Sequence, residues 1–167
     1  VLGQEYPAWE IIVVNDGSTD DTPFILDRYQ DRIIRIDIKN SGISNATNAG
    51  LSRVSGDCVA FLDHDDVWFR NRLKKQAEYI SKYPDIGFFC CDYRVGRLHS
   101  KDSGVVHYPL LKNLKELNFN SPLKRNPFEL LIKENFVGTS SAVVLKKETV
   151  NKAGSFNAQN KISQDYD

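Results

Sequence analysis

The sequence predicts an α/β fold in which helices flank a mostly parallel central sheet. Short, continuous apolar runs alternate along the chain with segments whose apolar residues recur at helical spacing. This alternation is typical of strand–helix–strand units in a parallel sheet. At 167 residues, of which 41% are hydrophobic and 26% charged, the chain is large enough to bury a core. No internal repeat or linker divides it, so we expect a single domain over residues 1–167.

The first half of the chain predicts two strands, each followed by a helix. An apolar run predicts the first strand over residues 10–14. Residues 18–21 offer a capping box for the helix that follows, and Pro23 lies in its first turn, where a missing N–H is tolerated. A second strand is expected over 33–38, and apolar or small residues at helical spacing follow over 43–54.

The second half repeats the pattern around an acidic sequence. A third strand over 58–62 leads directly into Asp63-His64-Asp65-Asp66, here called the acidic run. Residues 95–125 show no sustained periodicity of apolar residues, which predicts a long irregular segment. The same reasoning predicts further strands over 86–93 and 140–145, and helices over 71–82, 126–134 and 147–152.

Charge and composition exclude several classes of protein. The formal net charge is zero, which argues against a nucleic-acid-binding protein. The longest apolar runs are too short to cross a bilayer. The three cysteines form neither a disulfide framework nor a zinc motif, which favours a reducing compartment. The sequence opens on a stretch typical of the tail of a helix and closes inside a polar segment, so we expect a truncated piece of a longer domain.

Two acidic motifs follow predicted strands, where ligands bind in open parallel sheets. One is Asn15-Asp16-Gly17-Ser18 and the other is the acidic run. Adjacent carboxylates repel each other, whereas Mg²⁺ or Mn²⁺ can bind between carboxylates and a diphosphate. The acidic run therefore predicts half of a metal site. Its alternative is a solvated loop that caps the next helix, and the alternative for Asp16 is ordinary turn chemistry.

Taken together, the motifs resemble the signatures of family 2 glycosyltransferases in the order in which that family carries them. The resemblance covers nearly the whole chain. The matching segments are 13–22, 40–44 with 48–51, 56–68, and 154–156 with 164–167.

The resemblance implies a GT-A type, Rossmann-like fold and inverting transfer of a sugar from a UDP-sugar or another nucleotide-sugar. It places Asp63 on the ribose side of the nucleotide and Asp65 on a Mn²⁺ or Mg²⁺ ion. Asp66 either shares that metal or orients the loop. The implied acceptor is a glycan or a lipid-linked acceptor, with synthesis at the cytoplasmic face of a membrane and peripheral association with it.

Further roles follow from the same resemblance. Asp16 is expected to contact uracil, Asn48 to lie near the nucleotide, and Asp165 to be the general base. Thr47 and Gln164 depart from the arginine and glutamate that are common in the family.

Two alternatives stay open at the level of the sequence. The two departures allow a catalytically inactive nucleotide-binding domain. Residues 61–67 also nearly fit the Asp-x-Asp signature of haloacid-dehalogenase-type phosphatases. In those enzymes the signature ends the first strand, whereas two strand–helix units precede it in this sequence.

Overall fold

The computed structural model describes residues 1–93, 129 and 137–159. Its strands are β1 (Ile12–Asp16), β2 (Ile34–Ile38), β3 (Cys58–Ala60), β4 (Phe88–Cys90) and β5 (Val143–Lys146). Its helices are α1 (Thr22–Asp27), α2 (Ile43–Leu51), α3 (Arg72–Lys82) and α5 (Lys147–Ala153), with the 3-10 helix η1 at Ser140–Ala142.

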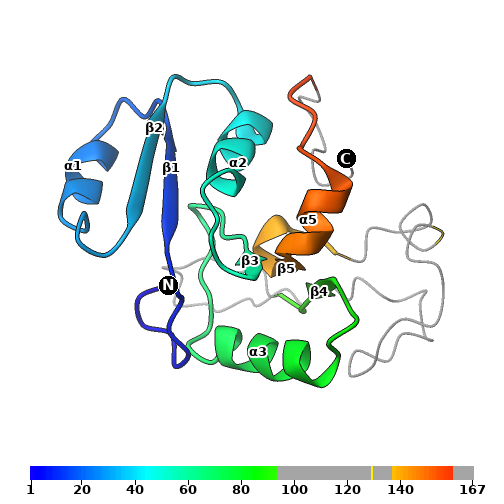
Figure 1. The fold of residues 1–167 in the computed structure, drawn as a ribbon. Coiled ribbons are helices and arrows are strands. Elements are labelled where there is room, and N and C mark those ends of the chain that lie inside the picture. Colours follow the sequence, from blue (N-terminus) through cyan, green and yellow to red (C-terminus); the bar gives the residue numbers. More distant parts are fainter. Residues whose placement is uncertain (94–128, 130–136, 160–167) are drawn as a thin grey trace, which may run out of the picture.

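The described strands form two small sheets. β1 and β2 pair in parallel, from Ile12 opposite Ile34 to Asp16 opposite Ile38. The second sheet has the order β3-β5-β4, and β5 runs antiparallel to both neighbours. In Figure 1, α1 lies beyond β2, whereas α2 packs beside β1 and lies between the two sheets.

The sheet therefore differs from the mostly parallel one that the sequence predicts. Only the pair β1–β2 is parallel among the described strands. The physical reason is the position at which β5 begins. Ser141, two residues before β5, lies beside Asp63, three residues after the end of β3, and its hydroxyl accepts a hydrogen bond from Asp63 N at 2.8 Å. A strand that starts beside the end of its neighbour must run antiparallel to it.

Most expected elements are present with shifted ends. The helix expected over 71–82 is α3, and the strand expected over 140–145 begins as η1 and continues as β5. The expected helix over 126–134 and the irregular segment over 95–125 lie outside the described residues, apart from residue 129. The capping box was wrong, since Asp20 Oδ1 instead accepts the Thr22 amide at 3.0 Å. The expectation of a single domain remains a prediction.

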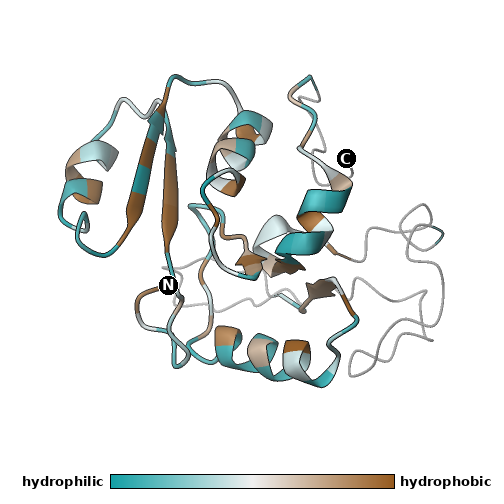
Figure 2. Cartoon of the chain, in the orientation of Figure 1, coloured by the Kyte–Doolittle hydropathy of each residue, from teal (hydrophilic) through white to brown (hydrophobic). Residues whose placement is uncertain are grey.

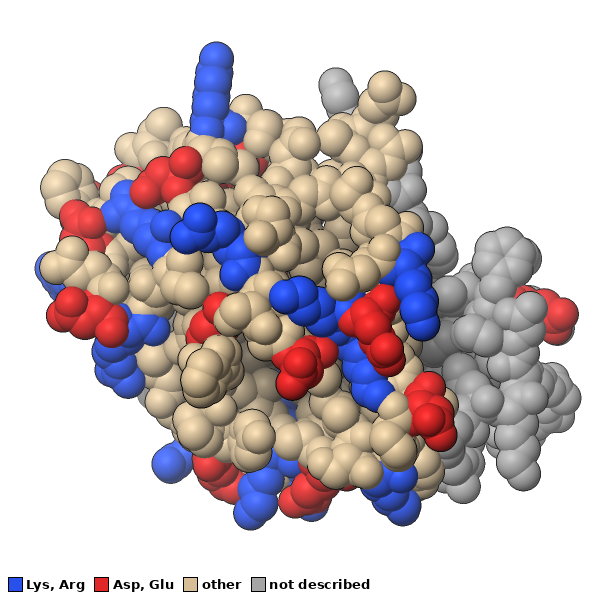
Figure 3. Space-filling view, viewed as in Figure 1, with Lys and Arg blue, Asp and Glu red and all other residues tan. Residues whose placement is uncertain are grey.

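Among the described residues, the most buried apolar ones lie on and next to the central strand β5. Ala142, Val143 and Val144 are 2%, 7% and 3% exposed. Figure 2 shows hydrophobic residues along β1 and β5, whereas α3 and α5 carry both hydrophobic and hydrophilic residues. Lysine and arginine side chains are interspersed with acidic ones over the face seen in Figure 3. None of the described helices combines the length and the apolar character needed to span a membrane.

Glu10 joins the two sheets where their strands begin. Its Oε1 accepts the backbone amides of Ser55 and Gly56 at 2.7 and 3.1 Å, and its Oε2 accepts the Ser55 hydroxyl at 3.1 Å. The Ser55 amide is the main reason that the pKa of Glu10 lies below its ordinary value. The carboxylate ahead of β1 thereby fixes the turn ahead of β3.

Replacing Glu10 by Gln should destabilise the protein at neutral pH and have less effect in acid. A depressed folded-state pKa contributes stability above the unfolded value, about 4.3 for Glu, and this contribution disappears as the pH falls through the folded value. We expect thermal unfolding at pH 7 to begin about 2–4 °C lower, which corresponds to about 1 kcal/mol in a chain of this size.

Glu78→Gln is the matched control. Glu78 pairs with Lys75 at 3.0 Å on the exposed face of α3, and surface pairs of this kind contribute little. A difference between wild type and Glu10→Gln that stays constant from pH 7 to pH 3 would contradict the assignment.

Candidate functional site

The acidic run forms the loop that leaves the carboxyl end of β3. All four of its side chains are exposed, and Asp66 N donates to Asp63 O at 3.2 Å within the loop. Among the residues that the structure describes, none of its carboxylates pairs with a lysine or arginine. Its negative charge therefore faces solvent, and no basic side chain of residues 1–93 or 137–159 neutralises it.

A segment of three hydroxyl residues, Thr139–Ser141, holds the acidic run in place. Ser141 Oγ accepts the Asp63 amide at 2.8 Å, and Ser140 Oγ donates to Asp63 Oδ2 at 2.7 Å. Thr139 Oγ1 donates a longer hydrogen bond, 3.5 Å, to Asp66 Oδ2. The segment thus fixes both the backbone and one carboxylate oxygen of Asp63.

Ser141 is itself anchored from α3 and the loop before it. It is 5% exposed, and its carbonyl accepts hydrogen bonds from Trp68 Nε1 at 3.1 Å and from the Arg72 guanidinium. The Arg72 guanidinium lies over the Trp68 ring, 4.3 Å from the ring centroid, an arrangement that is favourable between a cation and an aromatic face. Trp68 and Arg72 therefore hold Ser141, which in turn binds the backbone of Asp63 in the acidic run.

A glycine is required just before the hydroxyl segment. Gly138 has a φ of +78°, and a Cβ built there would lie 2.2 Å from the Tyr93 ring. Any other residue would combine an unfavourable backbone conformation with a steric clash. The close approach to Tyr93 positions the start of the segment.

Asp16, the second acidic candidate, ends β1 and faces the N-terminus of α2. Its Oδ1 accepts the Ser41 amide at 2.8 Å and its Oδ2 accepts the Gly42 amide at 2.9 Å. A carboxylate is favourable at this end of a helix. Oδ1 also accepts the Ser41 hydroxyl at 3.3 Å, whereas Oδ2 keeps a second lone pair, so this capping role is compatible with a further hydrogen bond from a nucleobase to Oδ2.

Asn15 fixes the strand end that carries Asp16. It is 7% exposed, donates from Nδ2 to Asp37 Oδ1 at 2.7 Å and accepts the Ser18 amide at 3.0 Å. Asp37 in turn pairs with Arg35 on β2 at 2.7 Å. The buried amide therefore ties β1 to β2 and shapes the turn that follows Asp16.

Asn48 lies on α2, and both polar atoms of its amide bind one residue. Its Nδ2 donates to the Phe156 carbonyl at 2.8 Å and its Oδ1 accepts the Phe156 amide at 2.9 Å. The Phe156 ring in turn meets Phe61 edge to face at 6.5 Å, two residues before Asp63. The expected contact of Asn48 with a nucleotide is not tested by these bonds, but they give the side chain a structural partner.

Asp165, the expected general base, lies outside the described residues. Among those that are described, no hydrogen bond joins Asp16 directly to the acidic run. The two acidic sites are instead linked indirectly, from the loop at Ser41 and Gly42 through α2 and Asn48 to Phe156.

The donor set of the acidic run suits a hard divalent cation. Asp63, Asp65 and Asp66 offer exposed carboxylate oxygens, the ligands that Mg²⁺ prefers, and Mg²⁺ commonly binds one or two carboxylates together with phosphates. No group of three histidine, cysteine or acidic side chains forms a complete metal cage within the described part of the chain. The residues thus fit a metal that a bound diphosphate completes.

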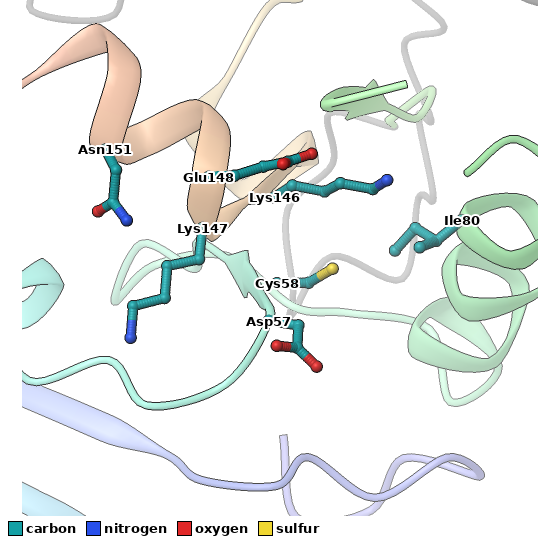
Figure 4. Close-up of a pocket in the computed structure, with 7 residues that line it drawn as sticks. All are labelled: Asp57, Cys58, Ile80, Lys146, Lys147, Glu148 and Asn151. Atoms are coloured by element: carbon teal, nitrogen blue, oxygen red, sulfur yellow. The ribbon is translucent and has the colours of Figure 1, made fainter. Parts of the chain in front are cut away.

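A pocket of about 420 Å³ lies at the other end of β3, where the strand begins. Figure 4 shows Asp57 and Cys58 at this strand end, with Lys147 and Glu148 at the start of α5 on the other side of the pocket. The two lysines of the pocket bind backbone carbonyls, Lys146 that of Pro84 and Lys147 that of Val54. Burial raises the pKa of the Cys58 thiol, so the thiol stays protonated at neutral pH. This pocket is separate from the acidic motifs.

Sequence reasoning missed the residues that hold the acidic run. Ser140 and Ser141 were assigned only to a strand, and no role was assigned to Arg72. The contacts of Ser140 and Ser141 with residues 63 and 68 span 73 to 78 positions of sequence. The only available signal was three adjacent hydroxyl residues directly before an apolar strand.

Comparison with known proteins identifies a family and a fold. The model of the family described as Glycosyl transferase family 2 matches residues 1–148. TuaG of Bacillus subtilis, the name of which links it to teichuronic acid biosynthesis, is 45% identical over 84 residues, 48% of this chain and 33% of that protein. WfgD of Escherichia coli, named as a UDP-Glc:alpha-D-GlcNAc-diphosphoundecaprenol beta-1,3-glucosyltransferase, is 36% identical over 98 residues, 57% of this chain and 38% of that protein.

Solved structures share the fold at low sequence identity. S. aureus TarS 1-349 matches 98% of this chain with a TM-score of 0.70 and 22% identity. The same protein in complex with UDP matches with a TM-score of 0.67 and 20% identity. The chain spans 46% of TarS 1-349 and about a third of the two curated relatives.

The close approach of Gly138 to Tyr93 predicts a specific loss of stability. Gly138→Ala should destabilise the protein by about 2–4 kcal/mol, because it adds a clash to the cost of a left-handed backbone. Gly154→Ala is the matched control, since Gly154 has a similar φ of +92° but no atom within 4 Å of a built Cβ. Chemical denaturation should show the larger loss for Gly138→Ala, and equal losses would contradict the packing against Tyr93.

Proposed function

Because the chain belongs to glycosyl transferase family 2, we propose that it forms the nucleotide-sugar-binding part of an inverting, GT-A type glycosyltransferase. The enzyme moves a sugar from a UDP-sugar to an acceptor hydroxyl. The observation that carries the proposal is the exposed acidic run at the end of β3, held by hydroxyl groups and not neutralised by a described lysine or arginine. The UDP complex of TarS and the UDP-Glc in the name of WfgD support a uridine nucleotide.

In this proposal each acidic residue contacts a different part of the donor. Asp16 accepts a hydrogen bond from the uracil N–H while it caps α2. Asp63 binds the ribose through the carboxylate that Ser140 orients. Asp65 and Asp66 hold Mn²⁺ or Mg²⁺, which when bound acts as a Lewis acid toward the diphosphate. Asn48 acts next to the nucleotide by holding Phe156.

The transfer step requires a base on the acceptor side. The acceptor oxygen forms a bond to the anomeric carbon as the bond from that carbon to the diphosphate oxygen breaks, so the configuration inverts. Asp165 takes the hydroxyl proton as attack proceeds. With a pKa of about 3.9, an aspartate is a weak base toward an alcohol. It is effective because the proton becomes acidic in the transition state and the two groups are already held together.

The proposed product is a polysaccharide or glycoconjugate. WfgD is named for an acceptor linked to diphosphoundecaprenol, which supports a lipid-linked acceptor here. An acceptor of this kind would bring the enzyme to the cytoplasmic face of a membrane as a peripheral protein.

Thr47 supports a second candidate function, a nucleotide-binding domain without transferase activity. The residue precedes Asn48 on α2 and replaces the arginine common in the family, which removes one cation from the vicinity of Asn48. Release of sugar from UDP-sugars in the presence of Mn²⁺ would separate the active enzyme from this candidate.

Asp65→Ala should abolish the metal-dependent part of UDP binding, because it removes a proposed metal ligand while leaving the contacts of Asp63 with Ser140 and Ser141 intact. Calorimetry of UDP with and without Mn²⁺ measures this difference directly. The wild type should bind UDP at least about 10-fold more tightly with Mn²⁺, which corresponds to about 1.4 kcal/mol.

Asp85→Ala is the matched control, since Asp85 is exposed in the turn before β4. It should retain the full effect of Mn²⁺. An undiminished effect of Mn²⁺ in Asp65→Ala would rule out the metal role of that residue.

Asp165→Asn, made in the full-length protein, should separate binding from chemistry. The amide cannot accept the acceptor proton, so transfer should fall by about 100-fold or more, while UDP affinity stays within about 2-fold of the wild type, a change of less than 0.5 kcal/mol. Transfer is followed by release of UDP in the presence of acceptor. If transfer persists at the wild-type rate, the base is a different residue.

A further inference from the structure

We propose that Ser140 is a positioning residue that presents the Asp63 carboxylate to the ribose of the bound nucleotide. The inference rests on the proposed function and extends it to a residue with no previous role. Ser140 Oγ donates to Asp63 Oδ2 at 2.7 Å, a short distance typical of a hydroxyl bound to a charged carboxylate. Within the described part of the chain, no hydrogen bond reaches Asp63 Oδ1, so that oxygen is available to a ligand.

The position of the Ser140 hydroxyl is fixed by the fold. Ser140 opens η1, in which the Ser141 amide donates to Thr139 Oγ1 at 3.3 Å and the Ala142 amide donates to the Thr139 carbonyl at 3.0 Å. Directly after η1 the chain enters β5, where Val143 and Val144 are buried. The hydroxyl that binds Asp63 therefore lies next to the most buried apolar residues among those that the structure describes.

Asp63 is held at two points by consecutive residues. Ser141 Oγ accepts its amide at 2.8 Å, and Ser140 Oγ donates to its carboxylate. The first contact sets the backbone of Asp63 and the second selects one orientation of its side chain. A carboxylate that is already oriented loses less conformational entropy when a ligand binds, and this increases affinity.

Loss of the Ser141 hydroxyl and loss of the Ser140 hydroxyl should affect different properties, folding stability and ligand binding respectively. Ser141 is 5% exposed and its carbonyl anchors Trp68 and Arg72, so its replacement would disturb packing. The bond from Ser140 to Asp63 is exposed to solvent, where a single hydrogen bond adds little to folding stability. The main consequence of the Ser140 hydroxyl therefore falls on ligand binding.

The test is a thermodynamic cycle between the side chain and the ribose. UDP, 2′-deoxy-UDP and 3′-deoxy-UDP are titrated with Mn²⁺ into wild type, Ser140→Ala and Ser140→Thr, and affinities are measured by calorimetry. Ser140→Ala should weaken UDP binding about 2- to 10-fold, the effect of losing one preoriented side chain. The same substitution should reduce the affinity for at least one deoxy analogue much less, because that analogue lacks the ribose hydroxyl that Asp63 binds. Ser140→Thr, which keeps a hydroxyl, should restore UDP affinity.

Two controls separate the possible failures. Ser81→Ala, on the exposed face of α3, should leave all three affinities unchanged. The ligand-free thermal midpoint of Ser140→Ala should stay within about 3 °C of the wild type, as for a loss of up to about 1 kcal/mol. If Ser140→Ala weakens the binding of UDP and of both analogues equally, or loses much stability, the positioning role is overturned. In that case UDP binding by the wild type still supports the proposed function. Failure of the wild type to bind UDP overturns both.

Discussion

The negative charge of the acidic run, exposed at the end of β3, is the feature on which the site depends. Like charges repel each other, weakly in water and more strongly near a protein surface. The structure places no described lysine or arginine against Asp63, Asp65 or Asp66. It supplies neutral hydroxyl donors from Thr139 and Ser140 instead. These donors order the carboxylates without cancelling their charge, so the charge remains available to a cation.

The rest of the described fold connects this loop to the second acidic site. Asp16 binds the start of α2, Asn48 further along the helix binds Phe156, and the ring of Phe156 meets Phe61 just before the acidic run. At the opposite end of the strands, Glu10 ties the start of β1 to the turn before β3. These links hold two small sheets together although no described strand pair joins them. The distance between a nucleobase site and a phosphate site would be set by such links.

Local sequence patterns predicted the elements that depend on neighbouring residues. The apolar runs of β1 and β3 and the period of α3 are local, and so are the acidic residues that follow the two strands. The antiparallel placement of β5 was not predictable, because it depends on Ser141 meeting Asp63 across 78 positions. The hydrogen-bond partner of Asn48 was not predictable for the same reason, since Phe156 lies 108 positions away in the sequence. The predicted capping box of α1 was wrong although it involves only neighbouring residues, because the Asp20 carboxylate accepts the Thr22 amide instead.

A crystal structure of the protein with Mn²⁺ and UDP tests the central claim most directly. We expect anomalous scattering from manganese beside Asp65, with the diphosphate completing its coordination and the bond between Ser140 and Asp63 retained. Bound UDP without an ion at the acidic run, or an acidic run turned away from the diphosphate into solvent, would contradict it.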